Sequence, residues 1–226
     1  MLDLSVCIFH ILNQPQTLAK LRQEIQSAAG GSFDLPSLAT LEQLPYLNAT
    51  VTEGLRVSYG LASRLPRIRP YDAIQLRSVL KSSSKAGAKG EEVGYVVPPG
   101  YAVSMSAVHV HTNPDIFPDP HSFTPERWLD SEGKRRKDLD KYILSFSKGT
   151  RQCLGIKYVL PFFPGSMANT GSLAYAEIFI CLAALVLRLG DRLELFETTT
   201  EDVELHRDVF AVRPKPGTKG IRVLVK

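Results

Sequence analysis

The sequence lacks the features that mark several common protein classes. Its three cysteines, Cys7, Cys153 and Cys181, form no CxxC pair and no regular spacing, so neither a disulfide framework nor a zinc motif is indicated. They are predicted to be reduced thiols on the cytosolic side of any membrane. The net charge of +4 comes from scattered residues, which gives no footprint for nucleic acid. No internal repeat is present.

Long apolar runs are also scarce. Residues 173–189 form the most apolar stretch, but Glu177 interrupts it and it is short for a membrane span. A buried helix is predicted there. Residues 1–12 are apolar but have no basic region and no small-residue cleavage site, so a core helix is predicted and a signal peptide is not.

The composition is that of an ordinary globular protein, with 44% hydrophobic and 22% charged residues. Apolar spacing and proline starts predict helices over residues 2–12, 15–29, 38–44 (or a turn there), 45–56 and 173–189. Short strands are predicted over residues 64–68, 73–79, 95–97, 193–196 and 221–225, with a partly β stretch over 101–110. Residues 81–90 are predicted to be a surface loop. The expected fold class is mostly α with small β-sheets (α+β).

Residues 146–155 carry the clearest chemical signal. Cys153 lies between Gly149 and Gly155, with Arg151 two positions before it and Phe146 seven before it. Glycine lets a flat partner approach the backbone closely, and a nearby cation favours the thiolate form of a cysteine. A thiolate on such a loop can ligate a metal from one side, which is what a thiolate-ligated haem requires. The alternative is a buried structural cysteine on a glycine turn.

Two segments that precede this loop add to the signal. Glu53 and Arg56 lie three residues apart on a predicted helix and therefore share one face. The apolar residues around them favour a partly buried pair with a third partner, and Arg127 of the Pro-Glu-Arg-Trp segment, residues 125–128, can be that partner. The alternative is a solvated ion pair that contributes little. Each of the three segments is common on its own, and their order along the chain is informative.

With these residues in this order, the sequence closely resembles the cytochrome P450 family. Residues 146–155 match the family's haem-binding signature, residues 53–56 its ExxR helix and residues 125–128 its PERF-like segment, in the style of fungal secondary-metabolism members. The resemblance implies a partial P450 fold, with residues 1–226 as the C-terminal part of a single domain. It also implies haem-thiolate monooxygenation, in which one atom of O2 enters a small apolar substrate and the other is reduced to water.

The resemblance implies roles for individual residues as well. Cys153 is expected to be the axial thiolate of a haem b iron, and Arg151 and Arg64 are expected to pair with the haem propionates. Glu53, Arg56 and Arg127 are expected to form a structural triad behind the haem. The other candidates are Phe146, which would shield the thiolate, Gly149 and Gly155, which would let backbone approach it, and the substrate-lining residues Gly60, Leu61, Ala62, Ser63, Val209 and Phe210. Plain strand-edge packing is the alternative for the lining residues.

The expected partners and location also follow from the resemblance. Electrons are expected from NADPH through an NADPH–cytochrome P450 reductase that docks near the cysteine loop. The family is located at the cytosolic face of the endoplasmic reticulum membrane through an anchor that is not among these residues, so this chain is predicted to be cytoplasmic. His109 and His111 form an HxH pattern, for which surface or supporting histidines are a simpler interpretation than a metal site. A cysteine-nucleophile hydrolase would need a partner histidine, and no histidine has a sequence context that indicates one.

Two departures from the family pattern bear on activity. The chain is much shorter than family members and does not include the acid–alcohol pair of their central helix. Residues 157–172 separate Ile156 from the helix that should follow it almost directly, and two prolines and two glycines make a helix there implausible. The alternative function is therefore a truncated, non-catalytic P450 remnant that does not hold haem stably.

The segment 157–172 has the pattern expected of a retained intron. Codons AAG-TAY-GTN for residues 157–159 would contain a GTAYGT donor, and an AGY codon for Ser172 would contain the end of an AG acceptor. Removing the bases from the start of the donor through the end of the acceptor preserves the reading frame. It leaves AAY, an Asn codon, ahead of Leu173. A genuine insertion in a surface loop is the alternative.

Overall fold

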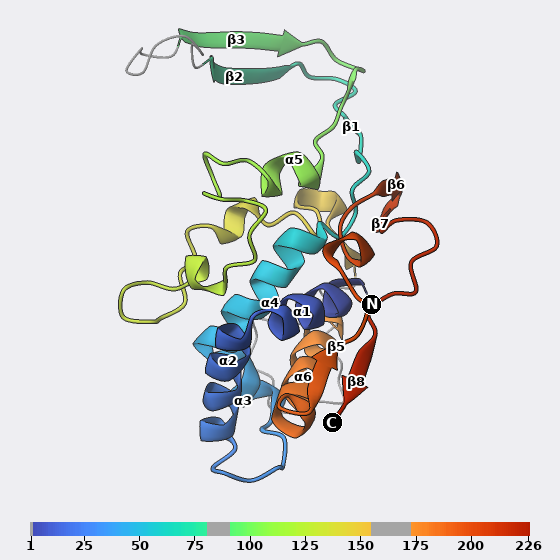
Figure 1. Cartoon of the computed structure of the whole chain (residues 1–226). Coiled ribbons are helices and arrows are strands. Elements are labelled where there is room, and N and C mark those ends of the chain that lie inside the picture. Colours follow the sequence, from blue (N-terminus) through green and yellow to red (C-terminus); the bar gives the residue numbers. More distant parts are fainter. Residues whose placement is uncertain (1, 81–90, 155–172) are drawn as a thin grey trace. The chain divides into compact units, whose positions relative to one another are not determined.

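The computed structural model of the chain describes residues 2–80, 91–154 and 173–226 (Figure 1). It divides into two compact units, of which the smaller is Arg64–Ser106 and the larger comprises the segments on either side. The predicted surface loop 81–90 and the predicted insertion 157–172 lie outside the described residues. The assignment of residues 1–226 to one domain stays a prediction.

The larger unit is built from helices whose starts follow the proline signals of the sequence. Its α-helices are α1 (Leu2–Asn13), α2 (Pro15–Ala28), α3 (Leu38–Gln43), α4 (Pro45–Ser58), α5 (Ala107–His111) and α6 (Leu173–Leu189). Its 3-10 turns are η1 (Pro125–Trp128), η2 (Asp140–Tyr142), η3 (Gly149–Arg151) and η5 (Thr200–Asp202). Pro15 and Pro45 occupy the first turns of α2 and α4, where an N–H would have no helical partner. The hydroxyl of Ser37 caps α3 by accepting from the N–H of Thr40.

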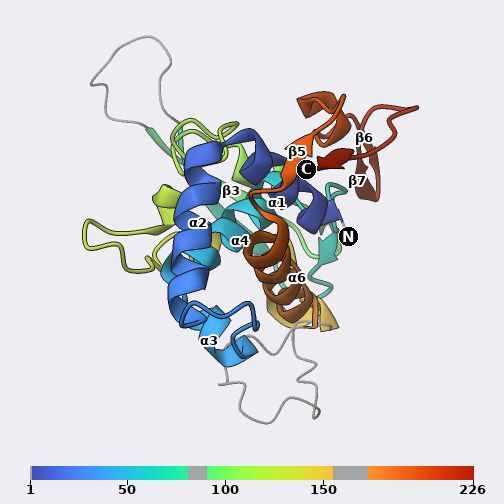
Figure 2. The same ribbon diagram turned by 60° about the horizontal axis from the view of Figure 1, so that its bottom comes forward.

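The main core lies where the first four helices pack on α6, and Figure 2 shows α6 beside α2 and α3. Its buried members include Ile11, Leu21, Ile25, Leu41, Leu47, Val51, Leu55, Phe179, Leu182 and Val186. α1 and α4 approach very closely at Gly54, where a Cβ atom would lie 2.0 Å from the sulfur of Cys7. Any side chain larger than a hydrogen atom at this position would separate the two helices.

The described part of the larger unit also contains two small antiparallel sheets. β5 (Leu193–Leu195) pairs with β8 (Val223–Val225), and β6 (Arg207–Val209) pairs with β7 (Ala211–Arg213). Phe210 forms the turn between β6 and β7 with a φ of 78°, in the left-handed region. Because both strands of this hairpin are three residues long, the alternation that would reveal them in a sequence is too short to detect.

The described residues of the smaller unit form two further antiparallel pairs. β1 (Arg67–Ile68) pairs with β4 (Ala102–Val103). β2 (Ile74–Leu80) pairs with β3 (Glu91–Val97), with Ile74 opposite Val97. These pairs supply the short strands that the sequence predicts in this region.

The predicted fold class, mostly α with small sheets, is confirmed. The predicted helix at residues 173–189 is present with the same bounds, and its buried side chains face the core. The partly β prediction for residues 101–110 holds only at β4, because residues 107–111 form α5, which is too short to show a helical period. Within the described ranges, no helix is long and apolar enough to cross a membrane.

Candidate functional site

The cysteine loop presents its thiol at the surface of the larger unit. The N–H of Cys153 donates to the carbonyl oxygen of Phe146 at 2.9 Å, which closes a loop that contains η3. Ser147 and Gly149 adopt positive φ values of 59° and 77°, and glycine meets this requirement without steric cost. The side chains of Arg151 and Cys153 are both exposed. The loop therefore places a soft metal ligand and a cation on one exposed segment.

The first residue of this loop is anchored by its aromatic side chain. Phe146 packs against the main core cluster, and its ring lies 5.2 Å from that of Tyr175 in α6, at an interplanar angle of 34°. The contact fixes the start of the loop on the helical core. The shielding role predicted for Phe146 stays a prediction, as does the role of Gly155, which lies outside the described residues.

A buried ion pair in α4 forms the centre of a hydrogen-bonded cluster. Arg56 donates from Nε and Nη2 to the two carboxylate oxygens of Glu53, both at 2.8 Å, and both side chains are 0% exposed. Nη1 donates to the carbonyl oxygens of His111 and Pro120 at 2.9 and 2.6 Å, and Nη2 also donates to that of Ser122 at 3.0 Å. A guanidinium has five N–H donors, and here every one has an acceptor. This complete bonding is what makes burial of the charged pair tolerable.

The carboxylate of Glu53 accepts three more N–H groups from the segment around η1. The backbone N–H of Thr124 and Nε of Arg127 donate to Oε1 at 2.9 and 3.0 Å, and Nε1 of Trp128 donates to Oε2 at 2.8 Å. The structure thus brings Glu53, Arg56 and Arg127 together, while their role behind a haem stays a prediction. Trp128 is a fourth member that the sequence pattern did not indicate. A buried indole N–H usually has a hydrogen-bond acceptor, and this rule could have indicated that Trp128 bonds to a nearby polar group.

A buried histidine connects this cluster to the segment that leads into the cysteine loop. His111 is 0% exposed at the end of α5; its Nδ1 lies 2.8 Å from the carbonyl oxygen of Arg56, and its Nε2 lies 2.9 Å from the backbone nitrogen of Leu144. Since the N–H of Leu144 can only donate, Nε2 accepts and Nδ1 carries the proton. Burial lowers the pKa of His111 to about 4, so the ring is neutral near pH 7.

The two histidines of the HxH pattern have different environments. His109 is exposed, whereas His111 is fully buried and bonded to backbone on both sides. Among the residues that the structure describes, no group of three or more His, Cys, Asp or Glu side chains is placed to hold a metal ion. The prediction of a supporting histidine therefore fits His111, and that of a surface histidine fits His109.

A serine makes a second connection between α4 and the residues before the loop. The hydroxyl of Ser145 donates to the carbonyl oxygen of Leu55 at 2.7 Å. Beyond Ser58 the backbone turns through Tyr59 and Gly60, which have positive φ values of 61° and 64°. A Cβ atom on Gly60 would lie 2.6 Å from the carbonyl oxygen of Ser145. Glycine at position 60 is thus required for both its backbone conformation and this close approach.

The two segments predicted to line a substrate site lie side by side. Leu61 forms an isolated antiparallel bridge with Ala211, and the hydroxyl of Ser63 donates to the carboxylate of Asp208 at 2.7 Å. Asp208 was not among the predicted residues. The side chains of Val209 and Phe210 are exposed, whereas that of Ala62 is buried. The geometry joins the segments, and the lining role of residues 60–63 and 209–210 stays a prediction.

Arg64 is the one predicted site residue that lies in the smaller unit. Its side chain is exposed. The predicted pairing of Arg64 with a haem propionate stays a prediction.

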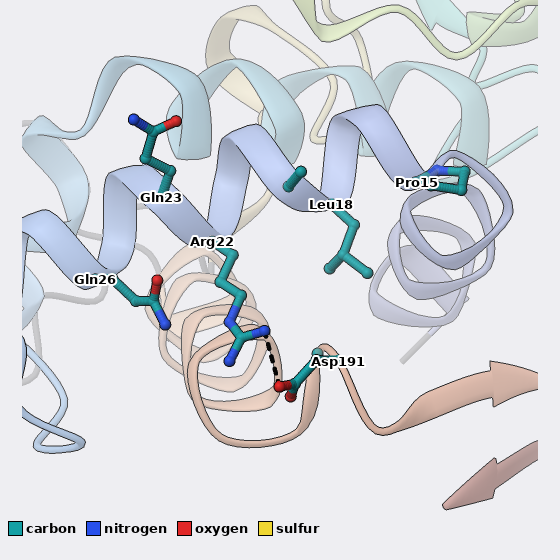
Figure 3. A pocket seen from close by; sticks show the side chains of 8 residues that line it. Pro15, Leu18, Arg22, Gln23, Gln26 and Asp191 are labelled. Atoms are coloured by element: carbon teal, nitrogen blue, oxygen red, sulfur yellow. Dashed lines mark ion pairs between the residues drawn. The ribbon is translucent and has the colours of Figure 1, made fainter. Parts of the chain in front are cut away.

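A separate hollow of about 330 Å³ lies between α2 and the end of α6 (Figure 3). Its lining residues are Pro15, Leu18, Ala19, Arg22, Gln23, Gln26, Gly190 and Asp191. Arg22 and Asp191 form an ion pair at 3.0 Å, so the charges in the hollow are already matched. The hollow contains none of the predicted site residues and is not part of the candidate site.

Comparison with known proteins identifies relatives of the chain. A family model described as "Cytochrome P450" matches residues 3–158. Curated relatives include the cytochrome P450 monooxygenases pbrB of Penicillium brasilianum (35% identical over 99% of this chain) and sdnE of Sordaria araneosa (37% identical over 98%). Another is the N-acetyltryptophan 6-hydroxylase ivoC of Emericella nidulans (35% identical over 97%). The chain covers 37% of the length of each of these three relatives.

Proposed function

Because the chain belongs to the cytochrome P450 family, we propose that it carries the haem-binding part of a haem-thiolate monooxygenase. The observation that carries the proposal is the exposed thiol of Cys153 on a loop with the exposed guanidinium of Arg151. Similarity to relatives named as monooxygenases supports it. The chain spans 37% of the length of these relatives, so the proposal concerns the contribution of this part to the activity of a whole protein.

The described residues fit a thiolate-ligated haem by the chemistry of their donors. The sulfur of Cys153 is accessible to a metal, in contrast to the buried thiol of Cys7, whose pKa is raised by burial. The guanidinium of Arg151 suits a propionate carboxylate, and the left-handed backbone at Gly149 leaves the loop without a Cβ atom at that point. When bound, a haem with a thiolate ligand supplies cleavage of the O–O bond of dioxygen.

The roles that we assign to the other residues follow from their positions in the larger unit. Glu53, Arg56 and Arg127 hold the segment around η1 on α4, and we assign them a supporting role behind the haem. We propose that residues 60–63 and 209–210 line the binding site of a small apolar substrate, because two exposed apolar side chains gather there beside α4's end.

The redox partner and the location are part of the same proposal. Electrons come from NADPH through a P450 reductase that docks near the cysteine loop, and the haem is of the b type. The parent protein functions at the cytosolic face of the endoplasmic reticulum membrane. These assignments rest on membership of the family.

A second candidate function is favoured by the share of the relatives that the chain spans. In this candidate, a chain with 37% of a relative's length does not by itself hold haem stably and is not catalytic. A single thiolate ligand on an exposed loop leaves most of a haem's apolar surface to be covered by other parts of a protein.

One spectroscopic experiment separates the two candidates. The purified chain is supplied with haem, reduced and exposed to carbon monoxide. The haem-thiolate proposal predicts a Soret band at the family's long-wavelength position, lost in Cys153→Ala and kept in Cys181→Ala, a matched exposed cysteine in α6. Absence of that band from the wild-type chain would overturn the haem proposal and support the remnant.

The segment 157–172 is proposed to be a retained intron. The family model's match ends at residue 158, whereas the curated relatives match 97–99% of the chain, so sequence after the segment is family-like as well. Genomic codons test the proposal: AAG at Lys157 and AGY at Ser172 are expected. An AAA codon at Lys157, or a TCN codon at Ser172, would contradict it.

A further inference from the structure

We propose that His111, together with Ser145, is a positioning residue that fastens the cysteine loop to the C-terminal end of α4. The inference rests on the proposed role of Cys153 as the haem ligand. His111 touches neither the thiol nor the exposed face of the loop. It acts through the backbone of Leu144, two residues before Phe146.

The C-terminal end of α4 has carbonyl groups whose partners lie outside the helix. The last four carbonyl groups of a helix have no partner within that helix and need one elsewhere when they are buried. In α4, two of these carbonyls find their donors in groups that are distant in sequence. The carbonyl of Leu55 accepts from the hydroxyl of Ser145, and that of Arg56 accepts from Nδ1 of His111. The end of α4 is thus completed by Ser145, which directly precedes the loop, and by His111 of α5.

The ring of His111 meets a requirement that few side chains can meet. It donates from Nδ1 to the helix and accepts at Nε2 from the N–H of Leu144, so it bridges a backbone acceptor and a backbone donor. Its position is fixed by packing between aromatic rings, with Tyr59 at 6.2 Å and Phe117 at 6.4 Å between centroids. Its own carbonyl oxygen accepts from Arg56, which ties the backbone of His111 to the buried ion pair.

A short series of bonds then reaches the backbone of Cys153. His111 accepts the N–H of Leu144, and the hydroxyl of Ser145 donates to α4. The next residue, Phe146, accepts the N–H of Cys153 at its carbonyl oxygen at 2.9 Å. Loss of the imidazole would leave the N–H of Leu144 without its acceptor inside the fold. We therefore expect the backbone from Leu144 to Cys153 to loosen while the helices stay formed.

The test uses His111→Phe, which keeps an aromatic ring of similar shape but offers neither a donor nor an acceptor. Hydrogen exchange of the backbone amides is measured on the full chain without haem. The amides of Leu144 and Cys153 are expected to exchange faster on the order of tenfold, the effect of losing a buried hydrogen bond. Amides of Leu21 in α2 are expected to be unchanged, and His109→Phe, a matched change at the exposed histidine of α5, should alter none of them.

Two further measurements keep the proposal testable if His111→Phe does not fold. Ser145→Ala removes one hydroxyl and should accelerate exchange of the same amides, and His111→Gln, which can still donate and accept, should restore part of the protection. Where His111→Phe folds and binds haem, it is expected to shift part of the carbon monoxide band away from the thiolate position. That shift would not arise from a purely local effect on stability.

The outcomes separate this inference from the proposed function. Unchanged exchange at Leu144 and Cys153 in both His111→Phe and Ser145→Ala would overturn the positioning role, whether or not the chain binds haem. Faster exchange in a chain that shows no haem band would support the connection to α4 and overturn the haem assignment of Cys153 instead.

Discussion

Two regions of the larger unit differ in whether their charged and reactive groups are buried or exposed. The side chains of Glu53 and Arg56 are fully buried, every N–H of the Arg56 guanidinium has an acceptor, and the Glu53 carboxylate accepts five N–H groups. In the cysteine loop, the thiol of Cys153 and the guanidinium of Arg151 lie at the surface. The buried cluster holds distant segments together, whereas the loop keeps its reactive groups accessible.

The difference has a simple physical basis. A buried charge is stable only while its partner is present, so removing one member exposes the other to the full cost of burial. An exposed charged group remains hydrated, and its ion pairs contribute little to stability. Changes in the cluster should therefore act on the free energy of unfolding, and changes in the loop should act on ligand binding.

The largest effect is expected from Glu53→Gln. The substitution keeps the shape of the side chain but removes the charge that neutralises Arg56, and it replaces one acceptor oxygen by an NH2 donor facing N–H groups. A cost of about 3–5 kcal/mol is expected in the free energy of unfolding, measured by urea denaturation followed by circular dichroism.

The matched control is Glu132→Gln, in an exposed ion pair with Lys134 at 2.6 Å. Both side chains of that pair are mostly exposed, so a cost below about 1 kcal/mol is expected. Equal costs for the two substitutions would remove the distinction between the buried cluster and the surface.

A second effect concerns pH and His111. Burial lowers the pKa of this histidine to about 4, below the value of about 6.5 that it has in the unfolded chain, and the charge of Arg56 acts in the same direction. The unfolded chain therefore binds the proton first as the pH falls. The stability contributed by neutral His111 is complete above pH 6.5 and is lost toward pH 4, a total of about 3 kcal/mol.

The groups that face the ring also bear on this titration. Glu53 opposes the shift through its negative charge, and the backbone groups of Arg56 and Tyr142 that bond the ring oppose it as well. His10, stacked on Phe123 at 4.7 Å between centroids, has a pKa that burial likewise lowers to about 4.

The contribution of His111 is isolated by a difference between proteins. Denaturation is measured between pH 4 and pH 7 for the wild type and for His111→Gln, which has no titrating ring. The wild type should lose more stability over this range than the variant. Parallel curves for the two proteins would show that His111 does not titrate with a lowered pKa.

The sequence predicted three members of the cluster. Glu53 and Arg56 were expected to share a face because three residues separate them on a helix, and Arg127 lies in a proline-fixed segment. Trp128 was not predicted as a member, and His111 was predicted only as a surface or supporting histidine, because their bonds to α4 join residues 75 and 55 positions apart. Bonds of this kind depend on how segments meet in space, which no periodic pattern records.

The same limit applied to secondary structure. The helices that begin at Pro15 and Pro45 were predicted because proline and apolar spacing act within one element. α5 and the β6–β7 hairpin were missed because each is too short to show a period. The hairpin is held by a neighbouring segment, through the bridge between Leu61 and Ala211. Sequence-based prediction was thus strongest where an element is long enough to carry its own signal.

A third, smaller effect is expected from Trp128→Phe. The change removes the indole N–H that donates to Oε2 of Glu53 at 2.8 Å, while Nε of Arg56 still bonds that oxygen. A ring remains to pack beside Phe117, so a cost of about 1–2 kcal/mol in the free energy of unfolding is expected.

A double-mutant cycle separates the hydrogen bond from lost packing. If the indole acts through Glu53, the cost of Trp128→Phe should change when Glu53→Gln is already present. Additive costs would assign the effect of Trp128 to packing and reduce the cluster to the three residues predicted from the sequence.

The smallest effect on stability is expected from Cys153→Ser, although this substitution should abolish thiolate ligation of haem. Cys153→Ser changes an exposed side chain, so the free energy of unfolding should stay within about 0.5 kcal/mol of the wild type. Cys7→Ser is the buried counterpart and should be clearly more costly, because its hydroxyl would lie in the contact with Gly54 of α4. In the haem-loaded chain, Cys153→Ser should abolish the thiolate band that Cys7→Ser, where it folds, retains. A Cys153→Ser variant that unfolded as readily as Glu53→Gln would mean that the loop also stabilises the fold, and the separation of the two regions would fail.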